Sequence, residues 1–202
     1  ILWNDKIKRG RTVKSILYHN YEPNADLTDT SDDITCFLDK IKYTIGNNIL
    51  LVGDIGNLGN RLRMLGVSVT ILENTCYEDI CYSLIKNVNC NVVKGSLEFL
   101  PFEDKYFDKV IILDHFNHTT DSERVISEIN RVLKVNGEVI LEDLNLKNIK
   151  VKLKNLKHKL CGENINYHYP NEIIDLFSKV NIKGIMKEIE NERYIYIGKR
   201  NR

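Results

Sequence analysis

A glycine-rich turn after a short apolar run constrains the fold of this chain more than any other feature. The run is Ile49 to Val52, and Gly53, Gly56 and Gly59 follow it. A short unbroken apolar run is typical of a strand that is buried on both faces of a parallel sheet. Glycines let the backbone turn tightly and approach a ligand where a side chain would block it. The pattern therefore predicts a buried strand, a glycine turn and then a helix.

A second apolar run, residues 67–72, ends in the acid Glu73. This acid lies 20 residues after Gly53, which is close to the distance at which a carboxylate meets the ribose hydroxyls in nucleotide-binding β-α-β units. Between the two runs we expect a helix from Asn60 to Leu65, closed by Gly66. The spacing indicates a site for an adenosine-containing cofactor. A plain strand-to-helix turn with an acidic strand end explains the same residues.

Helical and strand patterns alternate along the rest of the chain. The patterns predict helices at residues 31–45, 77–87, 121–134, 147–160 and 170–181, and strands at 91–94, 108–113, 138–142, 182–188 and 193–198. This alternation favours an α/β fold with an open, mostly parallel, doubly wound sheet. The two closing strands favour an antiparallel C-terminal edge. We expect an N-terminal helical segment, residues 1–46, packed on one domain, residues 47–202.

Composition excludes several classes of function. The chain has 202 residues and a net charge of +1, so no global field favours nucleic acid or a membrane as a partner. Its five cysteines are an odd set without a C-x-x-C pair, which favours reduced thiols and a cytoplasmic location. No apolar run approaches the length of a transmembrane helix, and the start lacks a signal-peptide pattern.

Two further segments resemble a known family. Residues 95–110 read GSLEFLPFEDKYFDKV, and residues 128–137 read EINRVLKVNG. The first resembles the segment G-D-A-x-x-L-P-F-x-D-x-x-F-D-x-V of class I S-adenosylmethionine-dependent methyltransferases, and the second is similar to their E-x-x-R-V-L-K-P-G-G. The resemblance covers about residues 48–199 and is to the "type 11"-like domain. It implies a Rossmann-like sheet of seven strands and methyl transfer to a small-molecule acceptor.

The resemblance also implies S-adenosylmethionine as the cofactor. It places these residues around that cofactor: Gly53, Asp54, Gly56, Asn57, Glu73, Asn74, Ser96, Leu97 and Asp114. Glu73 would accept hydrogen bonds from the ribose hydroxyls. Ser96, through its side chain, and Leu97, through its backbone N–H, would hold the adenine. Asp114 and His115 would border the sulfonium and the acceptor.

A general base is needed only if the acceptor must lose a proton. His118, on the loop after the fourth strand, is the first candidate, His115 is the second and Asp143 is the third. A loop histidine that packs a lid is the simpler explanation of His118, and a helix cap is the simpler explanation of Asp143. His168 and Tyr169 could face the acceptor, although a role in the turn is the simpler expectation.

A metal site is not expected. His115 and His118 lie three residues apart, with Asp114 and Asp121 nearby. A catalytic zinc site needs three converging protein ligands with second-shell support, and nothing in the sequence shows that these residues converge.

Two rival functions stay open. Ser96 stands where the family usually has an aspartate. In one register of the glycine turn Leu51 takes the place of the family's acid, and in the other register Leu58 takes the place of its second glycine. These departures favour a catalytically degenerate binding module or partner subunit as the first alternative. A nicotinamide-dependent oxidoreductase is the second, because G-x-x-G-x-x-G also occurs in reductases. The acceptor stays open too, as does assembly into a homodimer.

A basic amphipathic helix is predicted near the C-terminal end of the domain. The lysines from Lys147 to Lys159 form its polar face, with Ile149, Leu153, Leu156 and Leu160 opposite. A solvated polar face is the simpler expectation. Docking on RNA, on an acidic protein or on a membrane surface is the alternative.

Overall fold

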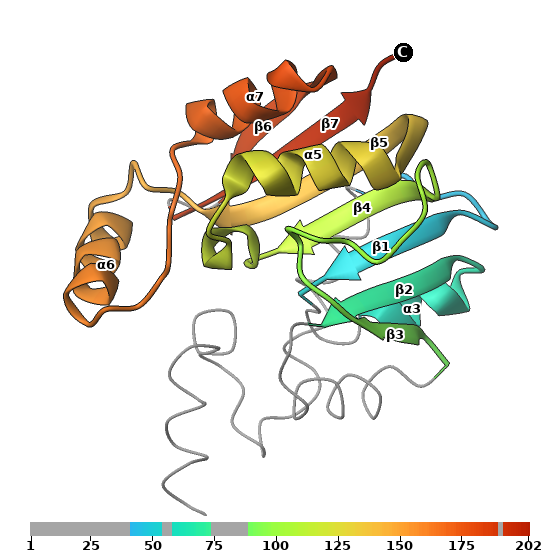
Figure 1. Cartoon of the computed structure of the whole chain (residues 1–202), viewed down its shortest axis with the longest axis horizontal. Helices are drawn as coiled ribbons and strands as arrows, with labels where there is room; N and C mark the ends of the chain where they lie inside the picture. Colours follow the sequence, from blue (N-terminus) through green and yellow to red (C-terminus); the bar gives the residue numbers. More distant parts are fainter. Residues whose placement is uncertain (1–40, 54–57, 74–88, 190–191) are drawn as a thin grey trace, which may run out of the picture. The chain divides into compact units, whose positions relative to one another are not determined.

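The computed structural model describes residues 41–53, 58–73, 89–189 and 192–202 (Figure 1). Its strands are β1 (Asn48–Val52), β2 (Ser68–Glu73), β3 (Asn91–Lys94), β4 (Phe107–Leu113), β5 (Leu133–Leu144), β6 (Ile182–Ile189) and β7 (Arg193–Arg200). Its helices are α3 (Leu58–Met64), α5 (Ser122–Val132), α6 (Ile149–Leu160) and α7 (Pro170–Lys179), with a short 3-10 helix η1 (Phe116–His118). Residues 43–202 form one compact unit.

The strands form one seven-stranded sheet in the order β3-β2-β1-β4-β5-β7-β6. The pairs β1–β2, β2–β3, β1–β4 and β4–β5 are parallel, whereas β5–β7 and β6–β7 are antiparallel. The predicted α/β sheet with an antiparallel C-terminal edge is thus confirmed. From β1 the chain adds β2 and β3 on one side and later β4 and β5 on the other. The strand order therefore reverses between β1 and β4, and ligands of such sheets bind outside the carboxyl ends of the strands at this point.

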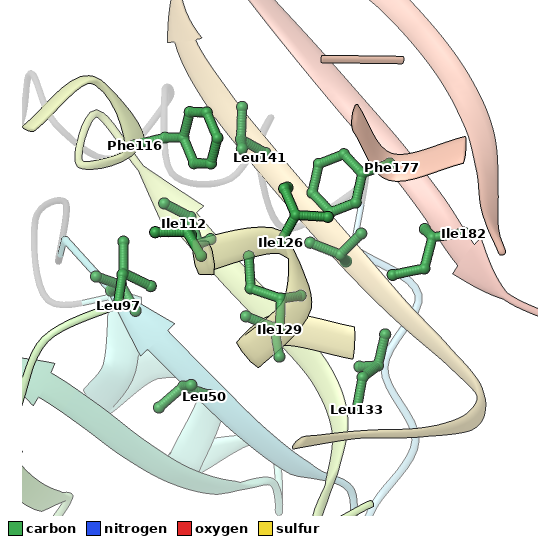
Figure 2. Packing of buried hydrophobic residues seen from close by; sticks show 14 of the residues in the cluster. Leu50, Leu97, Ile112, Phe116, Ile126, Ile129, Leu133, Leu141, Phe177 and Ile182 are labelled. Atoms are coloured by element: carbon green, nitrogen blue, oxygen red, sulfur yellow. The ribbon is translucent and has the colours of Figure 1, made fainter. Parts of the chain in front are cut away.

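The central strands are buried because their side chains are apolar on both faces. Residues 49–51 of β1 and 110–113 of β4 are completely inaccessible to solvent. Helix α5 contributes Ile126 and Ile129, which lie over Ile112 of β4 (Figure 2). Figure 1 shows α5 and α7 covering the same face of the sheet. Fully burying one such side chain contributes roughly 1.5–3 kcal/mol.

Aromatic packing holds the C-terminal strands β6 and β7 against α7. The rings of Phe177 and Tyr196 are stacked, with centroids 4.8 Å apart. Both side chains are completely buried, and Ile182 at the start of β6 belongs to the same cluster (Figure 2). This packing fixes β7 beside β5, where β7 brings Arg193 to the carboxyl edge of the parallel strands, opposite Leu144.

Several element boundaries differ from prediction. The helix predicted to reach residue 45 does not do so: residues 41–46 are not helical, and residues 31–40 lie outside the described residues. Helix α5 ends at Val132 rather than near residue 134, because Leu133 is already extended. The strand predicted at residues 138–142 begins already at Leu133, and Asn136 adopts a left-handed φ of 66° inside it.

Two predicted helical regions stay predictions. The N-terminal segment, residues 1–46, falls largely outside the described residues, and the helix at 77–87 falls wholly outside them. Among the residues that are described, no helix is both long and apolar enough to cross a bilayer. Cys161, which follows α6 and is exposed, is a free thiol.

Candidate active site

Gly53, the residue after β1, lies directly against the end of β4. Its φ is +74°, and a Cβ atom added to it would overlap the carbonyl oxygen of Leu113 and lie 2.7 Å from Nδ1 of His115. Only glycine therefore fits here without displacing the backbone of β4. Three of the residues predicted around the cofactor, Asp54, Gly56 and Asn57, lie outside the described residues.

Two of the departures from the family pattern have a structural explanation. Leu51 lies in the middle of β1 and Leu58 is the first residue of α3, and their side chains are 0% and 1% exposed. Both leucines are core residues. Their side chains add apolar burial at positions where the family has an acid and a glycine.

Glu73 is the last residue of β2 and lies at the same edge of the sheet as Gly53. Its exposed fraction is only 9%. Its carbonyl oxygen accepts a hydrogen bond from the N–H of Gly95, at 2.9 Å, so the chain after β3 begins beside it. Asn74, the next predicted residue, lies outside the described residues.

The loop after β3 is tied to the loop that precedes α5. Ser96 accepts a hydrogen bond from the N–H of Glu98 at 3.2 Å, and Leu97 is 6% exposed, with its side chain in the core (Figure 2). The carboxylate of Glu98 accepts hydrogen bonds from the N–H of Thr120 at 2.7 Å and of Asp121 at 3.1 Å. These bonds, those of Thr120 first, lower the pKa of Glu98. Asp121 is also the N-cap of α5, as predicted.

The two segments that carry the family resemblance bind each other. The guanidinium of Arg131 donates to the carbonyl oxygens of Leu100 and Phe102, at 2.9 and 2.7 Å. Glu128 accepts from the N–H of Leu100 at 2.9 Å and from Arg131 at 2.9 Å. The E-x-x-R pair on α5 therefore fixes the L-P-F loop, and that loop continues into β4.

A sharp turn follows β4 and presents two histidines. Asp114 has a left-handed φ of 50°, and its N–H donates to the carbonyl oxygen of Glu142 on β5 at 2.9 Å. The rings of His115 and His118 lie with centroids 5.8 Å apart. Burial first, and then the positive charge of His115, lower the pKa of His118 below its ordinary value of 6.5. The imidazole of His118 is therefore neutral at neutral pH and can accept a proton.

Asp143 is hydrogen-bonded to Asn117 in this turn. It is 1% exposed, and its carboxylate accepts hydrogen bonds from the backbone N–H and the side-chain amide of Asn117. The same amide group donates to Asp114 at 3.2 Å. Burial, and then the charge of Asp114, raise the pKa of Asp143 to about 8. Asp143 thus holds η1 in place. The N-cap of α6 is Asn148, not Asp143.

Sequence reasoning missed Arg193, which lies at the start of β7. Its Nε donates to the carboxylate of Glu142 at 2.8 Å, and its Nη2 lies 3.7 Å from Asp114. All three side chains are at most 15% exposed. No sequence motif identifies this arginine, because it reaches the carboxyl edge of the parallel strands only through the antiparallel pairing of β7 with β5.

A second missed group comes from α6 and the segment after it. The N–H of Asn166 donates to the carbonyl oxygen of Asn117 at 2.7 Å, which brings this segment against η1. Burial and then the charge of Asp114 raise the pKa of Tyr167, whereas burial lowers the pKa of Lys154 against the opposing effect of Asp114. The pKa values of both groups therefore respond to the charge of Asp114. Asp114 itself accepts a hydrogen bond from Asn117 and lies 3.7 Å from Nη2 of Arg193.

The remaining predicted residues have structural roles. His168 lies with Nε2 3.1 Å from the hydroxyl of Ser122. The N–H of Tyr169 donates to the carboxylate of Glu172 at the start of α7, at 2.9 Å, which is the turn role that was expected. Within the described residues, no group of three or more His, Cys, Asp or Glu side chains is arranged to hold a metal ion.

Part of the chain matches a known protein family. The family model described as a methyltransferase domain matches residues 63–141. An uncharacterised protein of Methanocaldococcus jannaschii is 38% identical over 96 residues, which are 45% of this chain and 38% of that protein. A glycine/sarcosine/dimethylglycine N-methyltransferase of Actinopolyspora halophila is 46% identical over 52 residues, 26% of this chain and 9% of that enzyme. The chain therefore matches well under two thirds of the length of either relative.

The fold is shared with solved structures at low identity. The phosphoethanolamine N-methyltransferase 2 of Haemonchus contortus, solved in complex with S-adenosyl-L-methionine, superposes with a TM-score of 0.70 at 12% identity. The alignment covers 85% of this chain and 53% of that one. At this identity the likeness establishes the sheet and its connections alone.

Proposed function

Because the chain contains a class I S-adenosylmethionine-dependent methyltransferase domain, we propose that it transfers the methyl group of S-adenosylmethionine to a small-molecule acceptor. The supporting observation is the buried polar cluster around Asp114. It lies at the carboxyl edge of the sheet, beside the reversal of strand order between β1 and β4. Such a reversal is where open α/β sheets bind their ligands.

The described residues fit the cofactor. Gly53 ends β1 with a left-handed φ, and the nearly buried Glu73 ends the neighbouring β2. In this proposal the Glu73 carboxylate accepts hydrogen bonds from the ribose hydroxyls, each worth roughly 1.5–3 kcal/mol. Ser96 and the N–H of Leu97 hold the adenine, and Asp114 borders the methionine end. Asp54, Gly56, Asn57 and Asn74 complete the proposed set.

The sulfonium, when bound, supplies an already activated methyl group for in-line displacement. The protein then has to align the acceptor and exclude water, and alignment alone can supply several kcal/mol. His118, neutral because it is buried, accepts the proton of an acceptor that must lose one. His115 is the second candidate for this role. Asp143 acts through Asn117, since it is too buried to touch the acceptor.

The nicotinamide-dependent oxidoreductase has less support. The family match spans residues 63–141 and so includes the whole L-P-F-x-D-x-x-F-D line, which an oxidoreductase does not explain. Fluorescence titration with NADH and NADPH distinguishes the two functions. Tight nicotinamide binding would favour the oxidoreductase.

The experiment for the proposed function is calorimetry with S-adenosylmethionine and S-adenosylhomocysteine. We expect both to bind the wild-type chain, and we expect Glu73→Ala to weaken both by at least tenfold, since each 1.4 kcal/mol is a factor of ten. Glu103→Ala, an exposed acid in the L-P-F loop, is the matched control and should leave affinity unchanged. Absence of binding by the wild-type chain at millimolar cofactor would favour the degenerate partner subunit. Mass spectrometry of any compound that co-purifies would identify the acceptor class.

A further inference from the structure

Helix α6 exposes a row of large apolar side chains. Ile149, Leu153, Leu156 and Leu160 are 68%, 61%, 55% and 79% exposed. They follow each other at spacings of four, three and four residues, so they lie on one side of the helix. The row is about 16 Å long at 1.5 Å per residue. Figure 1 shows α6 standing apart from α5 and α7, which cover the sheet.

The opposite side of α6 holds the helix to the domain. Val151 is 2% exposed, and Lys154 and His158 are partly buried. The side chain of His158 lies 2.5 Å from the carboxylate of Glu163. Asn148 caps the first turn by accepting from the N–H of Lys150 at 2.8 Å. The apolar row is therefore not needed to keep the helix in place.

The row is bordered by lysines on both sides. Residues 147–160 contain six lysines and no acid: Lys147, Lys150, Lys152, Lys154, Lys157 and Lys159. Lys150 and Lys157 lie along one border of the row, and Lys152 and Lys159 lie along the other. All four are exposed. The net charge of +1 for the whole chain conceals this local concentration of positive charge.

We propose that α6 is an interfacial helix that docks the domain on an anionic membrane surface. A row of leucine and isoleucine bordered by lysines suits that environment, because the apolar side chains enter the acyl boundary while the lysine heads reach the phosphate and carboxylate groups. Anionic lipid also attracts each lysine electrostatically. The proposal rests on the surface of α6 alone and holds whatever the carboxyl edge binds.

The charge and the apolar row together distinguish this occupant from a second copy of the chain and from RNA. Pairing with α6 of a second copy would bring the bordering lysines of the two helices together, and like charges repel across such a seam. RNA would use the lysines, but it would leave the four apolar side chains exposed to water. An anionic lipid surface would bury the four apolar side chains and attract the lysines on both sides of them.

Flotation of the full chain with lipid vesicles tests the proposal. We expect binding to vesicles of phosphatidylcholine mixed with phosphatidylserine and at least tenfold weaker binding to phosphatidylcholine alone. The paired substitution Leu153→Gln and Leu156→Gln should weaken binding to the anionic vesicles at least tenfold, because glutamine keeps the helix propensity but not the apolar surface. Met64→Gln removes an apolar side chain that is 76% exposed on α3 and should leave binding unchanged.

Charge-reversal substitutions test the role of the lysines. Lys157→Glu with Lys159→Glu should weaken binding at least tenfold, whereas Lys183→Glu with Lys187→Glu makes the same charge change on β6 and should weaken it far less. Circular dichroism checks that each variant keeps its helix content. Equal binding of all variants, or no binding to anionic vesicles, would overturn the proposal.

Two other outcomes would replace the lipid with another occupant. Self-association of the wild-type chain in sedimentation velocity, abolished by the paired leucine substitution, would assign the row to a second copy. A gel shift with single-stranded RNA, lost in Lys157→Glu with Lys159→Glu but kept in the leucine variant, would assign the lysines to nucleic acid. Either result, found without binding to anionic vesicles, counts against the membrane surface.

Discussion

The buried carboxylate of Asp143 accepts two hydrogen bonds from Asn117, one from the backbone N–H at 3.1 Å and one from the side-chain amide at 2.7 Å. Through this pair the end of β5 holds the 3-10 turn that carries His118. The same amide reaches Asp114, so the two acids share one donor. The position of the proposed base therefore depends on a residue 25 positions further along the chain.

Asp143 should make stability depend on pH. Its pKa is raised from 3.8 to about 8 by burial and by Asp114, so between these values the folded chain holds a proton that the unfolded chain has lost. The contribution of Asp143 to the free energy of unfolding is then present at low pH, and it is lost as the pH rises from 3.8 to about 8. Urea denaturation across the window should show a steeper fall for the wild type than for Asp143→Asn, which cannot ionise.

The matched control for this pH series is Asp175→Asn, an exposed acid on α7. This variant should follow the wild-type curve. If Asp143→Asn followed it too, the carboxylate would be ionised in the fold throughout the window.

The sheet could be predicted because its signals are local. The buried strands β1 and β4 each contain an unbroken apolar run, at residues 49–52 and 110–113. The four-residue strand β3 was placed at residues 91–94, where the structure has it. Helix α5 was placed by its cap, Asp121, and by the spacing of its apolar residues. The end of α5 was missed because Leu133 suits a helix or a strand equally, and pairing with Phe107 decides the matter.

The site could be predicted only in part, because it is assembled across the sheet. Asp114, His115 and His118 could be proposed as site residues because they lie within five residues of the end of a predicted strand. Arg193 was missed, since it reaches Asp114 through the pairing of β7 with β5. Tyr167 was missed because no short motif marks its place in the segment after α6. The exposed row on α6 shows the same limit. Amphipathic spacing identifies an apolar face, but it does not say whether the protein covers that face.

His118 should titrate below its ordinary range. Burial removes water from the imidazolium and His115 repels it, so the pKa of His118 is lower than 6.5. Proton NMR of the imidazole signals, assigned by comparison with His118→Gln, measures this directly. Replacement of His115 by Gln should raise the pKa of His118, because it removes one of the causes that lower it. A pKa for His118 at or above 6.5 in the wild type would contradict its role as a neutral base.

Arg131 should stabilise the fold through the L-P-F loop. Arg131→Ala leaves the carbonyl oxygens of Leu100 and Phe102 without their donor, and we expect a loss of about 1–3 kcal/mol in the free energy of unfolding. Arg131→Lys should recover only part of it, because an ammonium cannot reproduce the planar fork of donors. Urea denaturation measures both variants.

Lys179→Ala controls for the loss of a surface cation in that series. Lys179 forms an exposed ion pair with Glu123 at 2.7 Å, and such pairs contribute roughly 0–1 kcal/mol. A loss in Arg131→Ala no larger than in Lys179→Ala would mean that the loop keeps its place without the guanidinium.

Alanine substitutions at Gly53 and Gly162 separate the cost of backbone strain from the cost of steric overlap. Gly53 and Gly162 have nearly the same left-handed φ, +74° and +72°, but a Cβ at Gly162 would meet nothing within 4 Å, whereas one at Gly53 would overlap the backbone of Leu113. Gly162→Ala should therefore cost only the strain of the left-handed region, roughly 1–2 kcal/mol. Gly53→Ala should cost more and should also shift the NMR signals of His115, because the new methyl group displaces its ring. Equal losses of stability in the two variants, measured by urea denaturation, would show that the end of β4 can yield to a side chain at the end of β1.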